Sequence, residues 1–242
     1  MASSVTVDLV CVADSLNLLQ SCAARALSRL PPEVRSKAIV IVQHIRKDTE
    51  LAICQMRDAG LNIPLVLGIS YSVDADALNG LVTAGVPVHV GDVTALPERI
   101  EEHLNTADDG SVILVDVGGY AANLVAKSEY ARKLIGVVEE TNNGLWRYER
   151  TMPLVPIVQI ARCPNKGPEN VQVGEAIVKA AERALQSLGR DVTQERFAVL
   201  GYGGIGENVM GSLARRSLTC ATFDINRGGL KNPDSALSGR SA

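Results

Sequence analysis

Short apolar runs rich in β-branched residues alternate with longer amphipathic segments along most of the chain. A buried strand followed by an amphipathic helix, repeated many times, is typical of βαβ units in a parallel sheet. The pattern predicts strands at Val5–Val12, Ala38–Val42, Ile63–Gly68, Val86–Val90, Ser111–Val115, Leu134–Val137, Val155–Ile160, Arg196–Leu200 and Ser217–Phe223. It predicts helices at Ser15–Leu30, Asp48–Ala59, Ala75–Thr83, Pro97–Leu104 and Asn170–Leu188. The predicted fold class is therefore α/β, with a Rossmann-like parallel sheet.

A glycine marks the end of the last predicted helix. Gly189 follows the apolar face of residues 170–188, where a left-handed C-terminal cap is common. A boundary there gives a domain at 1–189 and an incomplete unit at 190–242. The second unit holds two strands and one helix, and the Gly- and Ser-rich stretch from Gly228 onward is interpreted as loop. Since so few elements are not stable alone, we expect this unit to pack on the first domain or a partner, or the chain to be a fragment.

Composition excludes several classes of partner and site. The net charge is −3 and aromatic residues make up 3% of the chain, so neither a nucleic acid nor an acidic membrane is an expected partner. The five cysteines lack the spacing of metal ligands, which favours reduced thiols and no metal. No signal peptide and no run long enough to span a membrane are evident. These features predict a soluble, cytoplasmic protein.

A glycine-rich turn directly follows the predicted strand Phe197–Leu200 and precedes an amphipathic stretch. In a strand–turn–helix, the first glycine of GxGxxG permits the tight turn, the second admits the pyrophosphate, and the third lets helix and strand pack closely. The helix N-terminus then faces the phosphates. The predicted cofactor-binding residues of this turn are Gly201, Gly203, Gly204, Ile205 and Gly206.

An acidic residue lies where such a site needs one. Asp224 ends the next predicted strand, 224 − 201 = 23 positions after the first glycine. A carboxylate near that offset accepts hydrogen bonds from the adenosine ribose and repels a 2′-phosphate. Arg227 favours NADP instead, because a nearby arginine can accommodate the 2′-phosphate. On balance the sequence predicts NAD as the cofactor rather than NADP; the alternative is a glycine turn without a ligand.

Five segments, in order, resemble one enzyme family. The segment Gly136–Gly144, which reads G-V-V-E-E-T-N-N-G, is similar to the adenosylhomocysteinase motif G-[IV]-S-E-E-T-T-T-G. Gly201–Gly206 matches the family's G-Y-G-D-V-G except at two positions. Weaker similarity is found at Gln43–Thr49, Leu114–Gly119 and Val155–Lys166. The resemblance covers roughly residues 38–230.

The resemblance implies two Rossmann-like domains, one for a nucleoside and one for NAD, in a homo-oligomer. It also implies a reaction in which NAD oxidises the ribose 3′-hydroxyl of S-adenosylhomocysteine, homocysteine is eliminated, water adds and the hydride returns. The cofactor performs the redox chemistry while protein groups move protons. The expected substrate is therefore S-adenosylhomocysteine or a related adenosine nucleoside.

The family's site residues carry over position by position. Lys166 matches the lysine that helps deprotonate the 3′-hydroxyl, His44 a histidine near the leaving group, and Glu140 a carboxylate at the ribose. Together with Asp116, these are the predicted catalytic residues. Asp48 and Thr49 match residues near the adenine and join His44, Glu140 and Lys166 as predicted substrate-binding residues. At the nicotinamide end of NAD, the matching residues are Thr141, Asn142 and Asn143.

This chain departs from the family at other positions. Val117 replaces a catalytic aspartate, and Asn170, Val171 and Glu175 replace an aspartate, an asparagine and a cysteine. Losing one proton-transfer group costs about 10²–10⁴ in rate, so we expect hydrolysis to be impaired. Oxidation at the 3′ position or epimerisation needs fewer proton transfers. The alternative is a non-catalytic nucleoside- and NAD-binding relative with a regulatory or partner-subunit role. For His44 and Lys166, a structural histidine and a solvated loop lysine remain the competing interpretations.

Overall fold

A computed structural model describes residues 24–164, 166–225 and 229–231 of this 242-residue chain. It divides into two compact units, Met1–Arg162 and Cys163–Ala242. The predicted strand Val5–Val12 and most of the predicted helix Ser15–Leu30 lie outside the described residues, although residues 24–28 are helical.

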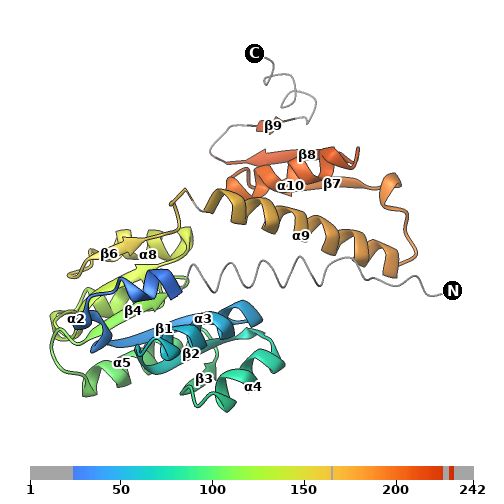
Figure 1. Cartoon of the computed structure of the whole chain (residues 1–242). Helices are drawn as coiled ribbons and strands as arrows, with labels where there is room; N and C mark the ends of the chain where they lie inside the picture. Colours follow the sequence, from blue (N-terminus) through green and yellow to red (C-terminus); the bar gives the residue numbers. More distant parts are fainter. Residues whose placement is uncertain (1–23, 165, 226–228, 232–242) are drawn as a thin grey trace. The chain divides into compact units, whose positions relative to one another are not determined.

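The first unit contains a six-stranded parallel sheet (Figure 1). Its strands are β1 (Ala38–Ile45), β2 (Asn62–Val73), β3 (Val88–Gly91), β4 (Val112–Asp116), β5 (Leu134–Glu139) and β6 (Ile157–Gln159). They lie in the order β3-β2-β1-β4-β5-β6, which is the strand order of the doubly wound Rossmann fold. Every strand predicted between residues 38 and 160 is confirmed, and so is the α/β fold class.

Both faces of this sheet are buried because its strands are apolar at successive positions. Val40 and Val42 point to one face of β1, while Ile39 and Ile41 point to the other. The first face packs against Leu96, Ile100 and Leu104, and the second against Ile53, Ala77 and Leu81. Burying one such side chain contributes about 1.5–3 kcal/mol. This two-sided burial is what fixes a parallel sheet between helices.

Among the helices described in the first unit, those over residues 47–58, 75–83 and 96–106 follow the predicted pattern with small shifts. The helices of this unit that lie wholly within the described residues are α2 (Pro32–Arg35), α3 (Lys47–Asp58), α4 (Ala75–Thr83), α5 (Leu96–Thr106), α6 (Ala122–Val125), α7 (Ser128–Ala131) and α8 (Asn142–Thr151). The helix predicted at Ala75–Thr83 is confirmed to the residue. The predicted helices do not include α2, α6, α7 or α8. The N-cap of α8 is Thr141, whose side chain accepts a bond from the Gly144 amide.

In the part of the second unit that the structure describes, two α-helices accompany a three-stranded sheet (Figure 1). The elements of this unit are α9 (Lys166–Ser187), a 3₁₀ turn (Val192–Gln194), β7 (Arg196–Leu200), α10 (Gly204–Arg215), β8 (Thr219–Asp224) and β9 (Gly229–Lys231). Strands β7 and β8 are parallel, and β9 pairs antiparallel with β8. Its core contains Val178 of α9, Val209, Met210 and Leu213 of α10, and Leu218 and Cys220.

Two expectations for this unit need correction. The boundary predicted at 189/190 lies instead at 162/163, because α9 packs on α10 and belongs to the second unit. A side chain at Gly174 would come within 2.7 Å of the Asn208 backbone, which shows how closely the two helices approach. Gly189 does cap α9, with a φ of 67°, but marks no boundary. The stretch interpreted as loop after Gly228 includes strand β9.

Candidate functional site

The turn between β7 and α10 has the backbone that its glycines predict. Gly201 adopts a φ of 101°, which a residue with a Cβ rarely adopts, and its amide donates to the Phe223 carbonyl at 2.8 Å. Gly203 is the N-cap of α10, and its carbonyl accepts the first helical bond, from Glu207, at 2.9 Å. The amides of Gly204, Ile205 and Gly206 are thus not used by the helix itself and are suited to an anion.

The other glycines of the turn have separate steric roles. A Cβ at Gly206 would overlap the Gly201 carbonyl oxygen, so any side chain there would force the turn open. A Cβ at Gly203 would meet no atom within 4 Å, so this position faces open space. The three glycines therefore have the roles that the sequence predicts. Gly201 adopts the positive φ of the turn, Gly203 leaves room for a phosphate, and Gly206 lets the helix pack closely on the turn.

Asp224 is held against this turn. Its Oδ2 accepts a hydrogen bond from the Tyr202 amide at 2.7 Å. This contact follows from the register of the two parallel strands, in which Leu200 is paired with Phe223 and the next residues form the turn and the acid. The structure therefore brings together the predicted glycines and the predicted acid within the second unit.

Helix α9 flanks the same turn. A Cβ at Gly204 would lie 2.7 Å from the Asn170 side-chain nitrogen, so Asn170 stands beside the first residue of α10. Lys166, predicted in a loop, is instead the first residue of α9, and its Nζ pairs with Glu169 at 2.8 Å. The Gly- and Pro-containing stretch suggests a loop, but proline is tolerated in the first helical turn.

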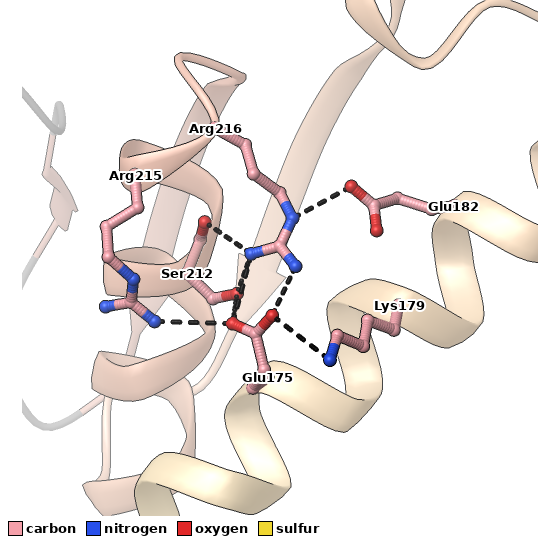
Figure 2. A network of polar contacts seen from close by, with 6 residues as sticks. All are labelled: Glu175, Lys179, Glu182, Ser212, Arg215 and Arg216. Carbon is pink, nitrogen blue, oxygen red and sulfur yellow. Dashed lines mark hydrogen bonds and ion pairs between the residues drawn. The ribbon is translucent and has the colours of Figure 1, made fainter. Parts of the chain in front are cut away.

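A polar network fixes α9 against α10 (Figure 2). Glu175 accepts hydrogen bonds from the Ser212 hydroxyl at 2.7 Å and from the Arg216 guanidinium, which also binds Glu182 at 2.8 Å. The Arg216 guanidinium is the main cause that lowers the pKa of Glu175 to about 2. Glu175, which replaces a cysteine of the resembled family, therefore acts here as an anchor between two helices.

The first unit has a pocket at its topological switch point. Strand order reverses between β1 and β4, and in open α/β sheets ligands bind at the carboxyl ends of the strands at that point. A cavity of about 240 Å³ is found there, lined by Ile41, Gln43, Asp48, Thr49, Ala52, Ile53, Met56, Val115 and Glu140. Three predicted substrate-binding residues thus lie together.

Gln43 organises this pocket, a role that the sequence pattern does not reveal. Its Nε2 donates to Glu140 Oε2 at 2.9 Å, while its Oε1 accepts from the His44 amide at 2.9 Å. The sequence offers one signal for this role, namely that Gln43 directly follows a predicted strand. It cannot reveal the partner, because Glu140 is 97 residues away. Thr49 is fixed by donating its hydroxyl to the His44 carbonyl at 2.8 Å.

His44, a predicted catalytic residue, does not line the switch-point pocket. Its ring is 5.9 Å from the Tyr71 ring. Burial, with a smaller effect of Arg46, lowers the pKa of His44, so the ring is neutral at pH 7. Its Nδ1 is buried and has no hydrogen-bond partner among the described residues.

Two buried carboxyl groups lie side by side at the ends of β4 and β5: Asp116, and Glu139 of the E-E-T segment. Glu139 accepts bonds from the Gly119 amide at 2.9 Å and from the Thr141 amide and hydroxyl at 2.7 Å. Asp116, paired with Glu139 across β4 and β5, accepts from the Tyr148 hydroxyl at 2.6 Å and the Ala121 amide at 3.1 Å. Asp116 has 0% exposed surface, so its carboxylate reaches no substrate directly, and burial raises its pKa to about 6.

The residues predicted at the nicotinamide end are in the first unit. Thr141 caps α8, and Asn142 and Asn143 are exposed in its first turn, where Asn142 Oδ1 accepts from Arg162 at 3.2 Å. The glycine turn belongs to the second unit.

Within the described part of the chain, no group of three or more His, Cys, Asp or Glu residues is placed to hold a metal ion. None of the helices described is both long and apolar enough to cross a membrane.

The fold and the site define an α/β protein with a Rossmann-type sheet and a glycine-turn βαβ unit. No family model and no curated protein matches the chain. Among solved structures, it is similar to a dipicolinate synthase component from Bacillus halodurans, with 12% identity, a TM-score of 0.41, and coverage of 78% of this chain and 62% of that one. It is also similar to GsuK bound to ADP, with 14% identity, a TM-score of 0.35, and coverage of 89% and 52%. A third similar structure is the hetero-hexameric glutamate dehydrogenase from Thermus thermophilus, with 16% identity, a TM-score of 0.26, and coverage of 85% and 47%.

The chain thus spans less than two thirds of the length of each of these proteins. At such identities and TM-scores, these similarities do not indicate the function of this chain.

Proposed function

We propose that the turn Gly201–Gly206 binds the pyrophosphate of a dinucleotide, and that Asp224 accepts hydrogen bonds from the adenosine ribose. The observation that carries the proposal is the juxtaposition of three features in one βαβ unit. These are the positive φ of Gly201, the lack of room for a Cβ at Gly206 beside the Gly201 carbonyl oxygen, and the Asp224 carboxylate that accepts from the Tyr202 amide. The α10 amides supply donors for the phosphates, and the carboxylate favours NAD over NADP.

Equilibrium dialysis of the full chain with radiolabelled NAD tests this proposal. The wild type is expected to bind, whereas Gly206→Ala, which forces the turn open, and Asp224→Ala are both expected to bind at least about tenfold more weakly. Gly167→Ala is the matched control, because a Cβ at Gly167 meets no atom within 4 Å. Absence of NAD uptake by the wild type, or equal uptake by all four proteins, overturns the proposal.

We further propose an adenosylhomocysteinase-like role in which the switch-point pocket holds an adenosine-type nucleoside. Support comes from the E-E-T-N-N-G segment and from Asp48, Thr49 and Glu140, which line one cavity. Glu140 can accept hydrogen bonds from ribose hydroxyls, and Gln43 orients it for that task. Lys166, the first residue of α9, keeps its candidate role of helping to deprotonate the 3′-hydroxyl on the resemblance alone. A homo-oligomer forms part of this proposal.

Turnover separates this role from its alternative. NAD-loaded protein is incubated with S-adenosylhomocysteine, and NADH absorbance, adenosine, homocysteine and altered nucleosides are followed. Release of homocysteine indicates hydrolysis, NADH with a ketone nucleoside indicates oxidation, and an altered nucleoside without net NADH indicates epimerisation. Nucleoside binding without any conversion favours the non-catalytic relative, for which the burial of Asp116 and the presence of Val117 are the specific observations. No binding and no conversion rejects the nucleoside proposal altogether.

A further inference from the structure

A second cavity in the first unit shares no lining residue with the switch-point pocket. It has a volume of about 470 Å³, within the range of small-molecule sites. Its walls contain two arginines, Arg147 and Arg150, and no aspartate or glutamate. The other lining residues are the polar Tyr120, Asn123 and Thr151, together with Val93, Pro97, Gly119 and Ala122. The charge of the walls therefore favours an anion.

Helix α8 brings the two arginines together. Arg147 and Arg150 are three residues apart, which places them on one face of the helix, about 5–6 Å apart at Cβ. Tyr148, between them in sequence, points into the core and is 1% exposed. A single anionic group can thus contact both guanidinium groups from the cavity.

Arg147 is already held in position. One of its Nη1 hydrogens is donated to the Gly118 carbonyl at 2.8 Å, and its guanidinium lies 5.6 Å from the centre of the Tyr120 ring. A guanidinium has five N–H donors, so most of them remain for a ligand. Holding the side chain before binding reduces the entropy lost when a ligand is bound.

Neutral donors strengthen the preference for an oxyanion. The Asn123 amide lines the cavity and can donate a hydrogen bond to a ligand. The Tyr120 hydroxyl is neutral, because burial and a hydrogen bond with Tyr71 raise its pKa to about 12. Among the described residues, the Arg150 side chain forms no ion pair that would compete with a ligand. Guanidinium groups bind phosphate in a bidentate manner, with charge-assisted bonds.

We propose that this cavity binds a phosphate-bearing small molecule through Arg147 and Arg150. This site is separate from the proposed dinucleotide turn, since the two belong to different units and have no residue in common. The proposal does not depend on whether NAD binds.

Nuclear magnetic resonance titration of the ¹⁵N-labelled full chain with inorganic pyrophosphate tests the site residue by residue. The expected result is saturable shifts at Tyr120, Asn123 and the Arg147 and Arg150 side chains. The affinity at these positions should fall about tenfold or more in Arg147→Gln/Arg150→Gln. Arg132→Gln, the same loss of charge at an arginine outside the cavity, should change it less than about twofold.

Single Arg150→Gln keeps the test valid if the double variant unfolds, because this exposed side chain lacks the Gly118 contact of Arg147. Shifts confined to Gly201–Gly206 would show that pyrophosphate binds the dinucleotide turn alone and would overturn the proposal. So would shifts at the cavity that persist unchanged in both arginine variants, or the absence of any shift at millimolar pyrophosphate.

Discussion

The Glu139 carboxylate accepts a hydrogen bond from the Gly119 amide at 2.9 Å, although 20 residues separate them. The same side chain accepts bonds from the Gly118 and Thr141 amides, so one buried carboxyl group joins the turn after β4 to the start of α8. Two of the five segments that resemble the adenosylhomocysteinase family, Leu114–Gly119 and Gly136–Gly144, are therefore joined in one structural unit. The hydrogen bonds of Glu139 give a structural reason for the two segments to occur together, independent of any catalysed reaction.

This arrangement makes Gly144 sensitive to substitution. A Cβ at Gly144 would overlap the Glu139 carboxyl group, which is buried and cannot move away without losing its donors. Gly144→Ala is expected to lower the free energy of unfolding by about 1–3 kcal/mol, measured by urea denaturation. The control Gly167→Ala, in open space near the start of α9, should change it by less than about 1 kcal/mol. Equal stability of the two variants would contradict the packing described here.

Asp116 predicts a pH dependence of stability. Its pKa is about 6 in the folded protein, against an ordinary value of 3.8, so the folded state binds more protons between these limits. Stability contributed by the protonated group is full below pH 3.8 and is lost as pH rises through 6. One pKa unit corresponds to about 1.4 kcal/mol, so the loss is about 3 kcal/mol.

Asp116→Asn removes this titration while keeping an acceptor for the Tyr148 hydroxyl. Urea denaturation at about pH 4 and about pH 7.5 should show that the variant gains stability relative to the wild type at the higher pH. Other carboxylates and His44 titrate in both proteins and cancel in the difference. A difference between the two proteins that is independent of pH would contradict the raised pKa.

The network between α9 and α10 predicts a second titration shift. Replacing Arg216 by glutamine should raise the pKa of Glu175 from about 2 toward its ordinary value of 4.5, by about one unit or more. Carboxyl ¹³C resonances followed against pH measure it. Because a lowered pKa stabilises the fold above the ordinary pKa, the wild type should lose stability as pH falls from 4.5 toward 2, and the variant should lose less. Arg190→Gln, whose partner is Glu195, is the control and should leave the Glu175 titration unchanged.

Local patterns are sufficient to predict most elements and the glycine turn. Strand β7 is Arg196–Leu200 as predicted, because an apolar run bounded by a glycine turn leaves little choice. Asp224 and the glycines are within 24 residues of each other, so their meeting follows from one βαβ unit. The start of α9 at Lys166 escapes prediction because Gly167 and Pro168 suggest a loop.

Long-range contacts are beyond the sequence patterns. Gln43 meets Glu140 only because β1 and β5 flank β4 in the sheet, an order that periodicity does not specify. The packing of α9 on α10 depends on Gly174, whose missing side chain is no signal by itself. Likewise, apolar spacing cannot tell that Asp116 is fully buried, since a strand-end aspartate is as often exposed to a ligand.

The central claim is that the Gly201–Gly206 turn and Asp224 form a dinucleotide site, and calorimetric affinities for NAD and NADP test it most directly. The account predicts that the wild type binds NAD at least about tenfold more tightly than NADP, since a carboxylate repels the 2′-phosphate. It also predicts that Asp224→Asn, which removes the charge but keeps an acceptor for the Tyr202 amide, reduces this preference severalfold. Failure of the wild type to bind either dinucleotide, or an unchanged preference in Asp224→Asn, would contradict it.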